Sequence, residues 1–407
     1  MGFNKHDVEK LSRALDEPSW LTERRLEAWG YFEKLELPKE KDEPWRYTDL
    51  RRLGFDLDAF SPLEPNPHDA GLALERDPKL EERGVVLLPL YNAIQTRPEL
   101  VQRYLLSQGN PGQDIFTALH TALFSGGTFL YVPRGVDVDI PVEATRTLSQ
   151  GGVGIFPHTL VVVEEGSSVV FIDRYRSDNL TQPSLSDAGV EIVAGAGSSV
   201  TFVAIQEYGR GVWHFGTQRA LLGRDASLQS LVVTLGATFS RAQVETTIAG
   251  EHGDVQMLGV YFAEADQHFD MRTLQDHAAP RSTSDLLYKG ALKDHSHTVY
   301  SGLIRVQRNA EKTDAYQANR NLVLSDHAKA DSKPELEILN NDVRCTHGST
   351  VGQVDDEQLF YLESRGISHD DAQRLIVEGF FEDVINRVRV EAVRNVLHDA
   401  IARKLAG

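Results

Sequence analysis

The sequence predicts a mainly β protein: a parallel β-helix (β-solenoid) flanked by α-helical regions at its N-terminal and C-terminal ends. Two observations predict this fold. Short alternating β-type runs recur across residues 126–354 with turns that resemble one another, and helical periodicity is confined to the two ends of the chain. A repeating strand–turn unit cannot bury its apolar face alone, whereas stacked copies bury a continuous core.

The turns of the middle zone set the length of the repeat. The turn EEGSSVVF around Gly166 returns as GAGSSVTF around Gly197 and more loosely as GRDASLQSL around Asp225, at spacings of 31 and 28 residues. Later turns, such as those at Asp294 and Asp326, belong to a series with about half this period. A jelly roll or a sandwich stays open as an alternative. The zone lacks the Asn-Gly and Asp-Gly turns that antiparallel hairpins favour, so the β-helix is preferred.

Residues 1–83 are expected to form an N-terminal helical region and a linker. Apolar residues at helical spacing within 7–37 predict a pair of helices. The segment EPWRYTDLRRL is predicted to be extended, with Trp45 and Tyr47 on one side. Residues 61–83, which have three prolines before position 70, are predicted to be a linker or mobile loop.

Residues 84–125 are expected to be a mixed lead-in, with a strand at 84–90 and helices near 98–107 and 114–124. The β-helix core then occupies 126–354. The runs that predict its strands are Thr128–Val132, Thr159–Val163, Ser168–Ile172, Val190–Val193, Ser199–Ile205, Leu228–Leu235 and Val255–Phe262.

Residues 355–407 are expected to form the C-terminal helical region. A first helix ends before Gly366, a residue that readily adopts the left-handed conformation at a helix end. Ser368 then caps a second helix, whose apolar stripe continues into 393–405.

The composition excludes several classes of function. The chain has 42 Lys+Arg and 60 Asp+Glu residues, a formal net charge of −18, which argues against nucleic-acid binding. No apolar run approaches the ~18 residues that cross a bilayer, and no signal peptide is visible, so we expect a soluble, cytoplasmic protein without a membrane partner. No phosphate-binding Gly-Lys-Ser/Thr loop is present, so any ATP hydrolysis is expected in another chain.

Two short arrangements offer metal chemistry. Cys345 and His347 lie two apart on a predicted strand, which places a thiol and an imidazole on the same side. His295 and His297 have the same spacing. A buried cysteine and exposed histidines on a solenoid turn are the commoner structural alternatives. Since this is the chain's only cysteine, an all-cysteine site within the chain is excluded, but a site shared with a partner is not.

Longer motifs resemble a known family. The run NDVRCTHGSTVGQVDDEQLFYLESRGISHDDAQRLIVEGFF closely resembles the C-terminal signature of the SufB/SufD family of iron–sulfur cluster assembly proteins. The N-terminal EPWRYTDL resembles an element of the SufD branch, as do the chain length and the Cys-x-His pair; SufB-type chains are longer and have more cysteines. The resemblance extends over essentially the whole chain.

This resemblance implies a right-handed parallel β-helix and a non-catalytic scaffold subunit of the SUF complex. The scaffold would pair with SufB and dock the SufC ATPase, while a desulfurase system supplies sulfur for a transient iron–sulfur cluster at the shared interface. Reduced flavin is associated with the family complex, and a homodimer is a further expectation for the isolated chain. Clusters need about four ligands, so this chain can supply only part of the set.

The resemblance also assigns residues. Cys345 and His347 match the interface positions of the family and are candidate metal ligands. The residues expected to dock SufC are Leu359, Phe360, Phe380 and Phe381.

Two alternatives remain open from the sequence. One is a homodimeric β-helix structural protein without metal chemistry. The other is a carbohydrate-active β-helix enzyme, for which acidic residues that cluster in the sequence would supply the carboxylates: Asp254, Glu264, Asp266 and Asp270.

Overall fold

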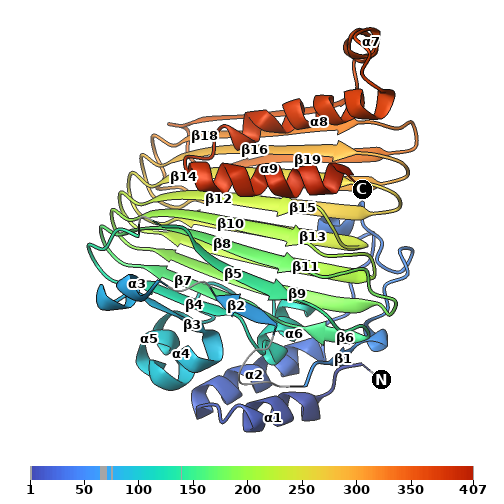
Figure 1. The fold of residues 1–407 in the computed structure, drawn as a ribbon. Helices are drawn as coiled ribbons and strands as arrows, with labels where there is room; N and C mark the ends of the chain where they lie inside the picture. Colours follow the sequence, from blue (N-terminus) through green and yellow to red (C-terminus); the bar gives the residue numbers. More distant parts are fainter. Residues whose placement is uncertain (1, 65–70, 75–76, 139, 407) are drawn as a thin grey trace.

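The computed structural model describes residues 2–64, 71–74, 77–138 and 140–406. Two long sheets face each other along a β-solenoid, with helices at its N-terminal end and along one side (Figure 1). Sheet A contains, in spatial order, β19 (Lys329–Ile338), β17 (His297–Val306), β15 (His268–His277), β13 (Phe239–Ile248), β11 (Val212–Leu222), β9 (Ser184–Ala194), β7 (His158–Val163), β4 (Thr128–Val132) and β3 (Val86–Pro89), with β6 (Val153–Ile155) and β1 (Ser61–Pro62) at its border.

Sheet B contains β2 (Leu72–Leu74), β5 (Val142–Thr147), β8 (Ser168–Arg176), β10 (Ser199–Glu207), β12 (Ser227–Thr234), β14 (Asp254–Ala263), β16 (Thr283–Leu292), β18 (Asp314–Val323) and β20 (Arg344–Gln353). From β7 onward the chain alternates between the sheets, and neighbouring strands within each sheet are parallel. The mainly β, parallel β-solenoid fold is therefore confirmed.

The similar turns are the corners of the solenoid. The N–H of Gly166 donates to the carbonyl of Ala196 at 2.9 Å, and the N–H of Gly197 donates to the carbonyl of Arg224 at 2.8 Å. Both glycines have positive φ, +66° and +65°, in the left-handed region that L side chains rarely adopt. The series with half this period also has a structural cause. Asp294 lies in the corner between β16 and β17, and the next corner, between β17 and β18, leads back to sheet B, so two corners occur in each rung.

The interior is packed with apolar and aromatic side chains. Phe171 and Phe202, at the same register position of β8 and β10, stack with centroids 5.8 Å apart. In later rungs the interior also holds Tyr261, Tyr288 and Tyr300, which are all buried. Stacked rungs thus give a continuous core, as the repeat predicts.

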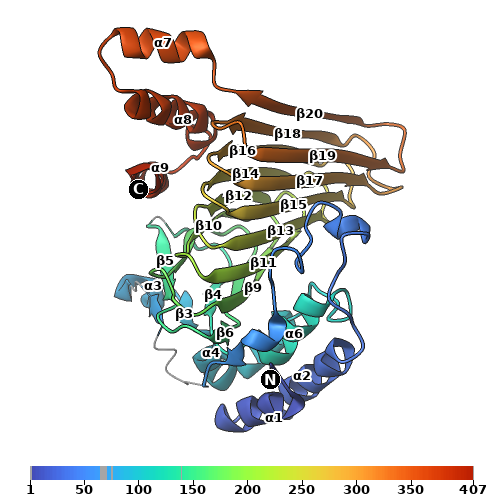
Figure 2. The same ribbon diagram turned by 90° about the vertical axis from the view of Figure 1, so that its right-hand side faces the viewer.

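The N-terminal helices cover the outer face of sheet A near its first rungs. The pair expected within 7–37 is present as α1 (Lys5–Ala14) and α2 (Ser19–Phe32), and α6 (Ile115–Leu123) lies beside them (Figure 2). Phe116 of α6 stacks on Phe215 of β11 with centroids 3.9 Å apart. The lead-in also contains α4 (Leu90–Thr96), which was not predicted, and α5 (Pro98–Tyr104).

The segment EPWRYTDLRRL, here called the strap, crosses the outer face of sheet A (Figure 2). The prediction of an extended segment is wrong, because Glu43–Trp45 forms a 3-10 turn, η1, with Pro44 in its first turn. Trp45 is buried and lies 3.8 Å from the Arg241 guanidinium carbon, whereas Tyr47 is only half-buried. A second turn, η2 (Leu57–Ala59), follows.

The expected linker is partly structured. Among its described residues, β1 pairs with β6, β2 pairs with β5 in the antiparallel direction, and a short helix α3 (Pro78–Glu82) forms. Residues 65–70 and 75–76 of this stretch lie outside the described residues, so the prediction of a mobile loop is not tested there.

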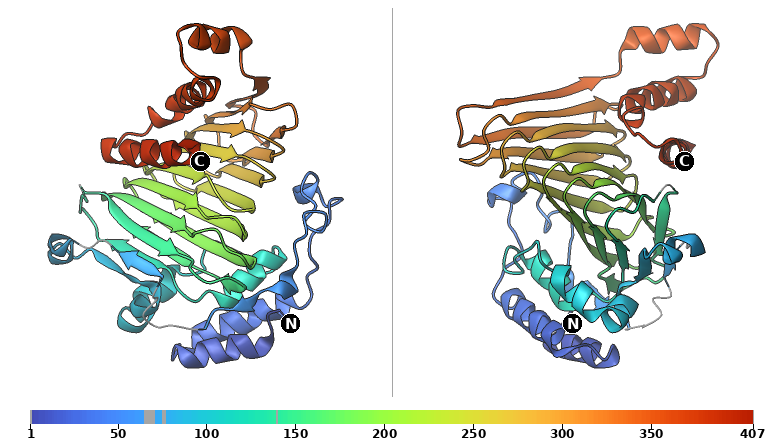
Figure 3. Two further views of the ribbon diagram at one scale, coloured as in Figure 1. Left: turned by 45° about the vertical axis from the view of Figure 1, so that its right-hand side comes forward. Right: turned by 90° about the vertical axis from the view of Figure 1, so that its left-hand side faces the viewer.

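The C-terminal region contains α7 (Asp356–Ser364), α8 (His369–Ile385) and α9 (Glu391–Ala406). Ser368 caps α8 as expected, and Gly366 has φ +86°. The apolar stripe continues into α9 as expected, because Val384 of α8 and Leu397 of α9 belong to one buried cluster against sheet B. The helix itself is interrupted, since α8 ends at Ile385 and α9 begins at Glu391. Helices α8 and α9 lie along the outer face of sheet B and do not close the end of the solenoid (Figure 3).

Candidate functional site

The last rung of the solenoid places Cys345 and His347 together. Both lie on β20, where Cys345 pairs with Ala315 of β18 and His347 pairs with Gln317. Cys345 packs against a small apolar cluster of the last rungs that includes Ile304 and Val306, so its side chain faces the interior. Since successive strand residues alternate between faces, His347 lies on the same face as Cys345.

The two side chains differ in exposure. Cys345 is half-buried, whereas His347 is exposed because no described strand lies beyond β20. Burial and the nearby Asp314 carboxylate raise the pKa of the Cys345 thiol. The thiol therefore stays protonated at neutral pH unless a metal ion or a cation displaces its proton.

The four residues predicted to dock a partner differ in how exposed their side chains are. Phe360 on α7 is 71% exposed, and Leu359 beside it is half-buried. Phe381 on α8 is fully buried against sheet B, and Phe380 is half-buried with its ring 4.5 Å from Lys289 Nζ. Of the four residues, Phe360 is thus the most accessible to another chain.

His295 and His297 line one pocket together with His268, but they do not lie on one strand. His297 begins β17, but His295 lies in the preceding corner, so the expectation that both lie on one strand is wrong. His297 Nε2 pairs with Asp331 Oδ2 at 2.7 Å, and its ring lies 4.7 Å from that of His268. In the described part of the chain, no group of three or more His, Cys, Asp and Glu residues is arranged to hold a metal ion.

The four acidic residues of the enzyme alternative do not form one groove. Asp270 is buried on β15 and pairs with Arg241 and Arg272. Glu264 pairs with Lys404 of α9 at 2.6 Å. The remaining two, Asp254 and Asp266, are exposed in different parts of the rung.

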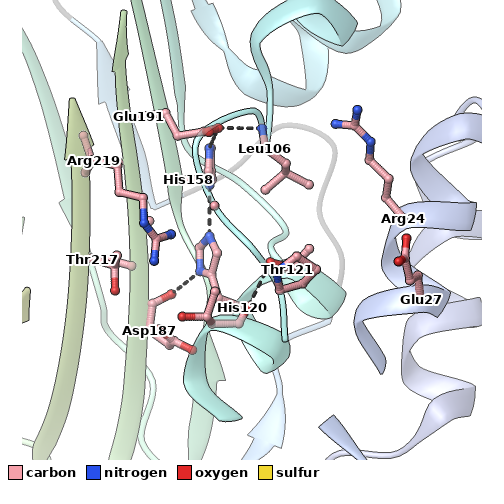
Figure 4. A pocket seen from close by; sticks show the side chains of 16 residues that line it. Arg24, Glu27, Leu106, His120, Thr121, His158, Asp187, Glu191, Thr217 and Arg219 are labelled. Carbon is pink, nitrogen blue, oxygen red and sulfur yellow. Dashed lines mark hydrogen bonds and ion pairs between the residues drawn. The ribbon is translucent and has the colours of Figure 1, made fainter. Parts of the chain in front are cut away.

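A buried polar network that no sequence pattern indicated lies between the N-terminal helices and sheet A (Figure 4). His120 of α6, His158 of β7 and Glu191 of β9 form a hydrogen-bonded chain there. The three residues are 38 and 33 positions apart in the sequence. The register of β7 on β9 is the only sequence-related signal for the spacing of His158 and Glu191, because these two residues lie on neighbouring strands one rung apart.

Comparisons with known proteins agree on one family. Residues 146–380 match the family described as SUF system FeS cluster assembly, SufBD core domain, and residues 72–144 match the SufBD protein N-terminal region. The iron–sulfur cluster assembly protein SufD of Bacillus subtilis is 30% identical over 100% of this chain and 98% of its own length. An iron–sulfur cluster assembly SufBD family protein of Mycobacterium leprae is 34% identical over 95% of each chain.

A SufBD family protein of Mycobacterium tuberculosis is 35% identical over 91% of this chain and 90% of its own length. None of the helices within the described ranges is long and apolar enough to cross a membrane. The core-domain match covers more than half of the chain, and the similarity to SufD runs from end to end. The chain therefore belongs to the SufBD family of iron–sulfur cluster assembly proteins and is SufD-like.

Proposed function

We propose that this chain is the non-catalytic scaffold subunit of a cytoplasmic SUF complex, in which it pairs with a SufB-type chain and docks a SufC-type ATPase. The observation that best supports the proposal is the position of Cys345 and His347. Both lie on β20, the strand at which the solenoid ends within the described part of the chain. A partner at this end would meet a thiol and an imidazole directly.

The open end of the solenoid supports pairing with a homologous chain. The outer edges of β19 and β20 face no further strand among the described residues, and unpaired strand edges favour strand addition. Exposed apolar side chains lie on the same strands: Leu336 and Ile338 are 38% and 40% exposed, and Val351 is 50% exposed. A SufB-type solenoid could continue both sheets and cover these side chains.

In the proposed interface the iron–sulfur cluster is cargo. This chain would supply the Cys345 thiolate and the His347 imidazole, and the SufB-type chain would supply the other ligands, since a cluster needs about four. The sulfur would come from a desulfurase system. Reduced flavin is proposed for the complex as a whole, and we assign no residue of this chain to it.

Helix α7 supports the proposed ATPase docking. It projects away from the solenoid, and none of its residues is buried (Figure 1). Phe360 and Tyr361 are 71% and 56% exposed, a pair of aromatic side chains of the kind that anchors protein interfaces. We therefore propose Leu359 and Phe360 as the main contacts with the SufC-type ATPase and Phe380 as a contact at the edge of this docking surface.

Reconstitution with the SufB-type and SufC-type chains tests the proposal. Cys345→Ser and His347→Ala should each lower the yield of assembled cluster while the three chains still co-purify. Thr346→Ala is the matched control, because Thr346 lies between the two residues on the opposite face of β20. Full cluster yield in both variants would remove the ligand role.

Failure of the three chains to co-purify would contradict the scaffold role itself. Light scattering on the isolated chain would then decide whether it forms a homodimer through the same open end.

A further inference from the structure

A cavity of about 150 Å³ lies between sheet A and the N-terminal helices (Figure 4). We call it the interlayer cavity. Strands β7, β9 and β11 form its floor, and α2, α6 and the loop at 106–111 form its other walls. The charged and titratable side chains that line it are Arg24, Glu27, His120, His158, Asp187, Glu191 and Arg219. None of these residues takes part in the proposed cluster interface or in ATPase docking.

One side of the cavity is a rigid chain of hydrogen bonds. His120 Nδ1 donates to the carbonyl of Asp187 at 2.8 Å, so His120 Nε2 must accept from His158 Nδ1, 3.0 Å away. His158 Nε2 lies 3.1 Å from Glu191 Oε2, and one proton must lie between them. Every nitrogen of the two imidazoles is therefore already used, and neither is free for a ligand.

Gly189 leaves room for this series of hydrogen bonds. A Cβ atom at this position would lie 2.4 Å from His120 Nε2 and 2.8 Å from His158 Nδ1. Glu191 is held in turn by the N–H groups of Leu106 and Gln108, at 2.6 and 2.9 Å. The wall is thus a preorganised part of the fold.

Asp187 differs from the other polar residues of this wall because its carboxyl group makes no hydrogen bond with a described residue. Its side chain is 3% exposed, its Oδ2 atom is buried without a hydrogen-bond partner, and no described residue donates to its carboxyl group. Burial, with a smaller contribution from Asp114, raises the pKa of Asp187 well above its usual value. Burial therefore favours the protonated form of this carboxyl group, whose O–H can donate a hydrogen bond.

Arg219 supplies the positive charge. Its Nε binds Glu245 at 2.9 Å and its Nη2 binds Gln113 at 2.8 Å, while no described residue accepts a hydrogen bond from Nη1. Figure 4 shows Arg219, Thr217 and Asp187 along the same side of the cavity. An unused guanidinium N–H, a hydroxyl and an unpaired acid thus line one wall.

We propose that the interlayer cavity binds a small carboxylate, whose charged group pairs with Arg219 and whose second oxygen-bearing group accepts a hydrogen bond from Asp187. The Arg219 guanidinium, the Thr217 hydroxyl and the Asp187 carboxyl group on this wall can each donate a hydrogen bond, which fits an anion rich in oxygen acceptors, whereas Glu27 lines another part of the cavity. The volume fits a molecule of a few heavy atoms and excludes a nucleotide. A metal ion is disfavoured because no suitable ligand group exists among the described residues and Arg219 would repel it.

Calorimetry and thermal unfolding of the full chain test this proposal, with malonate as the probe. Malonate should bind at one site and raise the melting temperature as its concentration increases. Asp187→Leu, which removes the unpaired acid at similar volume, should leave the ligand-free chain at least as stable but weaken malonate binding about tenfold or more. Arg219→Gln should weaken malonate binding as well.

Asp173→Leu is the matched control. Asp173 is also a buried acid, but it lies outside the cavity and accepts hydrogen bonds from Tyr175 and Thr159, both at 2.7 Å. Its loss should lower the melting temperature without changing the Kd for malonate. The result with Arg219→Gln keeps the proposal testable if either leucine variant fails to fold.

Three outcomes would overturn the proposal. The first is the absence of binding heat and of a thermal shift with malonate and with acetate. The second is an unchanged affinity in both Asp187→Leu and Arg219→Gln. The third is an equal response to inorganic phosphate at matched ionic strength, which would indicate general anion binding.

Discussion

Replacing Phe381 separates the structural role of α8 from a role in docking. Phe381 is 0% exposed and packs in the apolar cluster between α8 and sheet B, which includes Leu258, Val260 and Leu287. Removing a fully buried phenylalanine side chain costs about 3 to 5 kcal/mol. Burial of about 150 Å² at about 25 cal/mol per Å² gives a similar value, about 4 kcal/mol.

Phe360 provides the matched control. It is the same residue type on the neighbouring helix α7, but it is 71% exposed. Phe360→Ala should therefore change the free energy of unfolding by less than about 0.5 kcal/mol. If α7 docks the ATPase, this variant should still weaken the complex, because its effect cannot come from loss of the fold.

Urea unfolding followed by two signals measures the difference. The four tryptophans, Trp20, Trp29, Trp45 and Trp213, all pack in the apolar cluster between the N-terminal helices and sheet A, so their fluorescence does not report directly on α8 and α9. In Phe381→Ala the helical circular dichroism signal should be lost at lower urea than the fluorescence signal.

Two results would refute this reasoning. A loss below about 1 kcal/mol in Phe381→Ala would mean that α8 does not depend on the sheet contact. An equal destabilisation by Phe360→Ala would mean that α7 packs within the chain and does not project from it.

Three further predictions concern pH, the strap and the thiol. Burial lowers the pKa of His277 to about 4, so its stabilising contribution is present above pH ~6.5 and is lost as the pH falls toward 4. Urea unfolding should show a loss of about 2 kcal/mol from this group between pH 7.5 and 5, and His277→Gln should reduce the dependence of the unfolding free energy on pH. Arg241 lies beneath Trp45 of the strap and pairs with Asp270, so Asp270→Asn should lower the free energy of unfolding by about 3 to 5 kcal/mol by leaving the buried Arg241 unpaired. Urea unfolding in which this variant matches the native chain would contradict that expectation. Burial and Asp314 raise the pKa of Cys345, so iodoacetamide should modify the thiol more slowly in the folded chain than in urea, and faster in folded Asp314→Asn than in the folded native chain. Equal rates in the folded native chain, in urea and in Asp314→Asn would show that the thiol is not perturbed.

Local sequence patterns were sufficient wherever a short stretch determines its own structure. The two N-terminal helices, the cap at Ser368 and the turn glycines Gly166 and Gly197 all follow from residues within one or two turns of each other. The repeat length was also readable, because identical corner geometry requires similar residues at each corner. The strap was predicted wrongly, since Pro44 and the contact of Trp45 with Arg241 favour a compact turn over an extended segment.

Short-range patterns alone predict the solenoid, its helical ends and the position of Cys345 and His347 on one face of a strand. The side of the solenoid that α8 covers depends on long-range packing, as does the contact of His120 and Glu191 with His158. The physical reason is that each rung brings the chain back to the same sheet, one strand further along, after 26 to 32 residues, as for Trp213 with Phe239 and His297 with Lys329. Side chains that lie a full rung apart become neighbours through strand register, and local patterns carry no record of that contact.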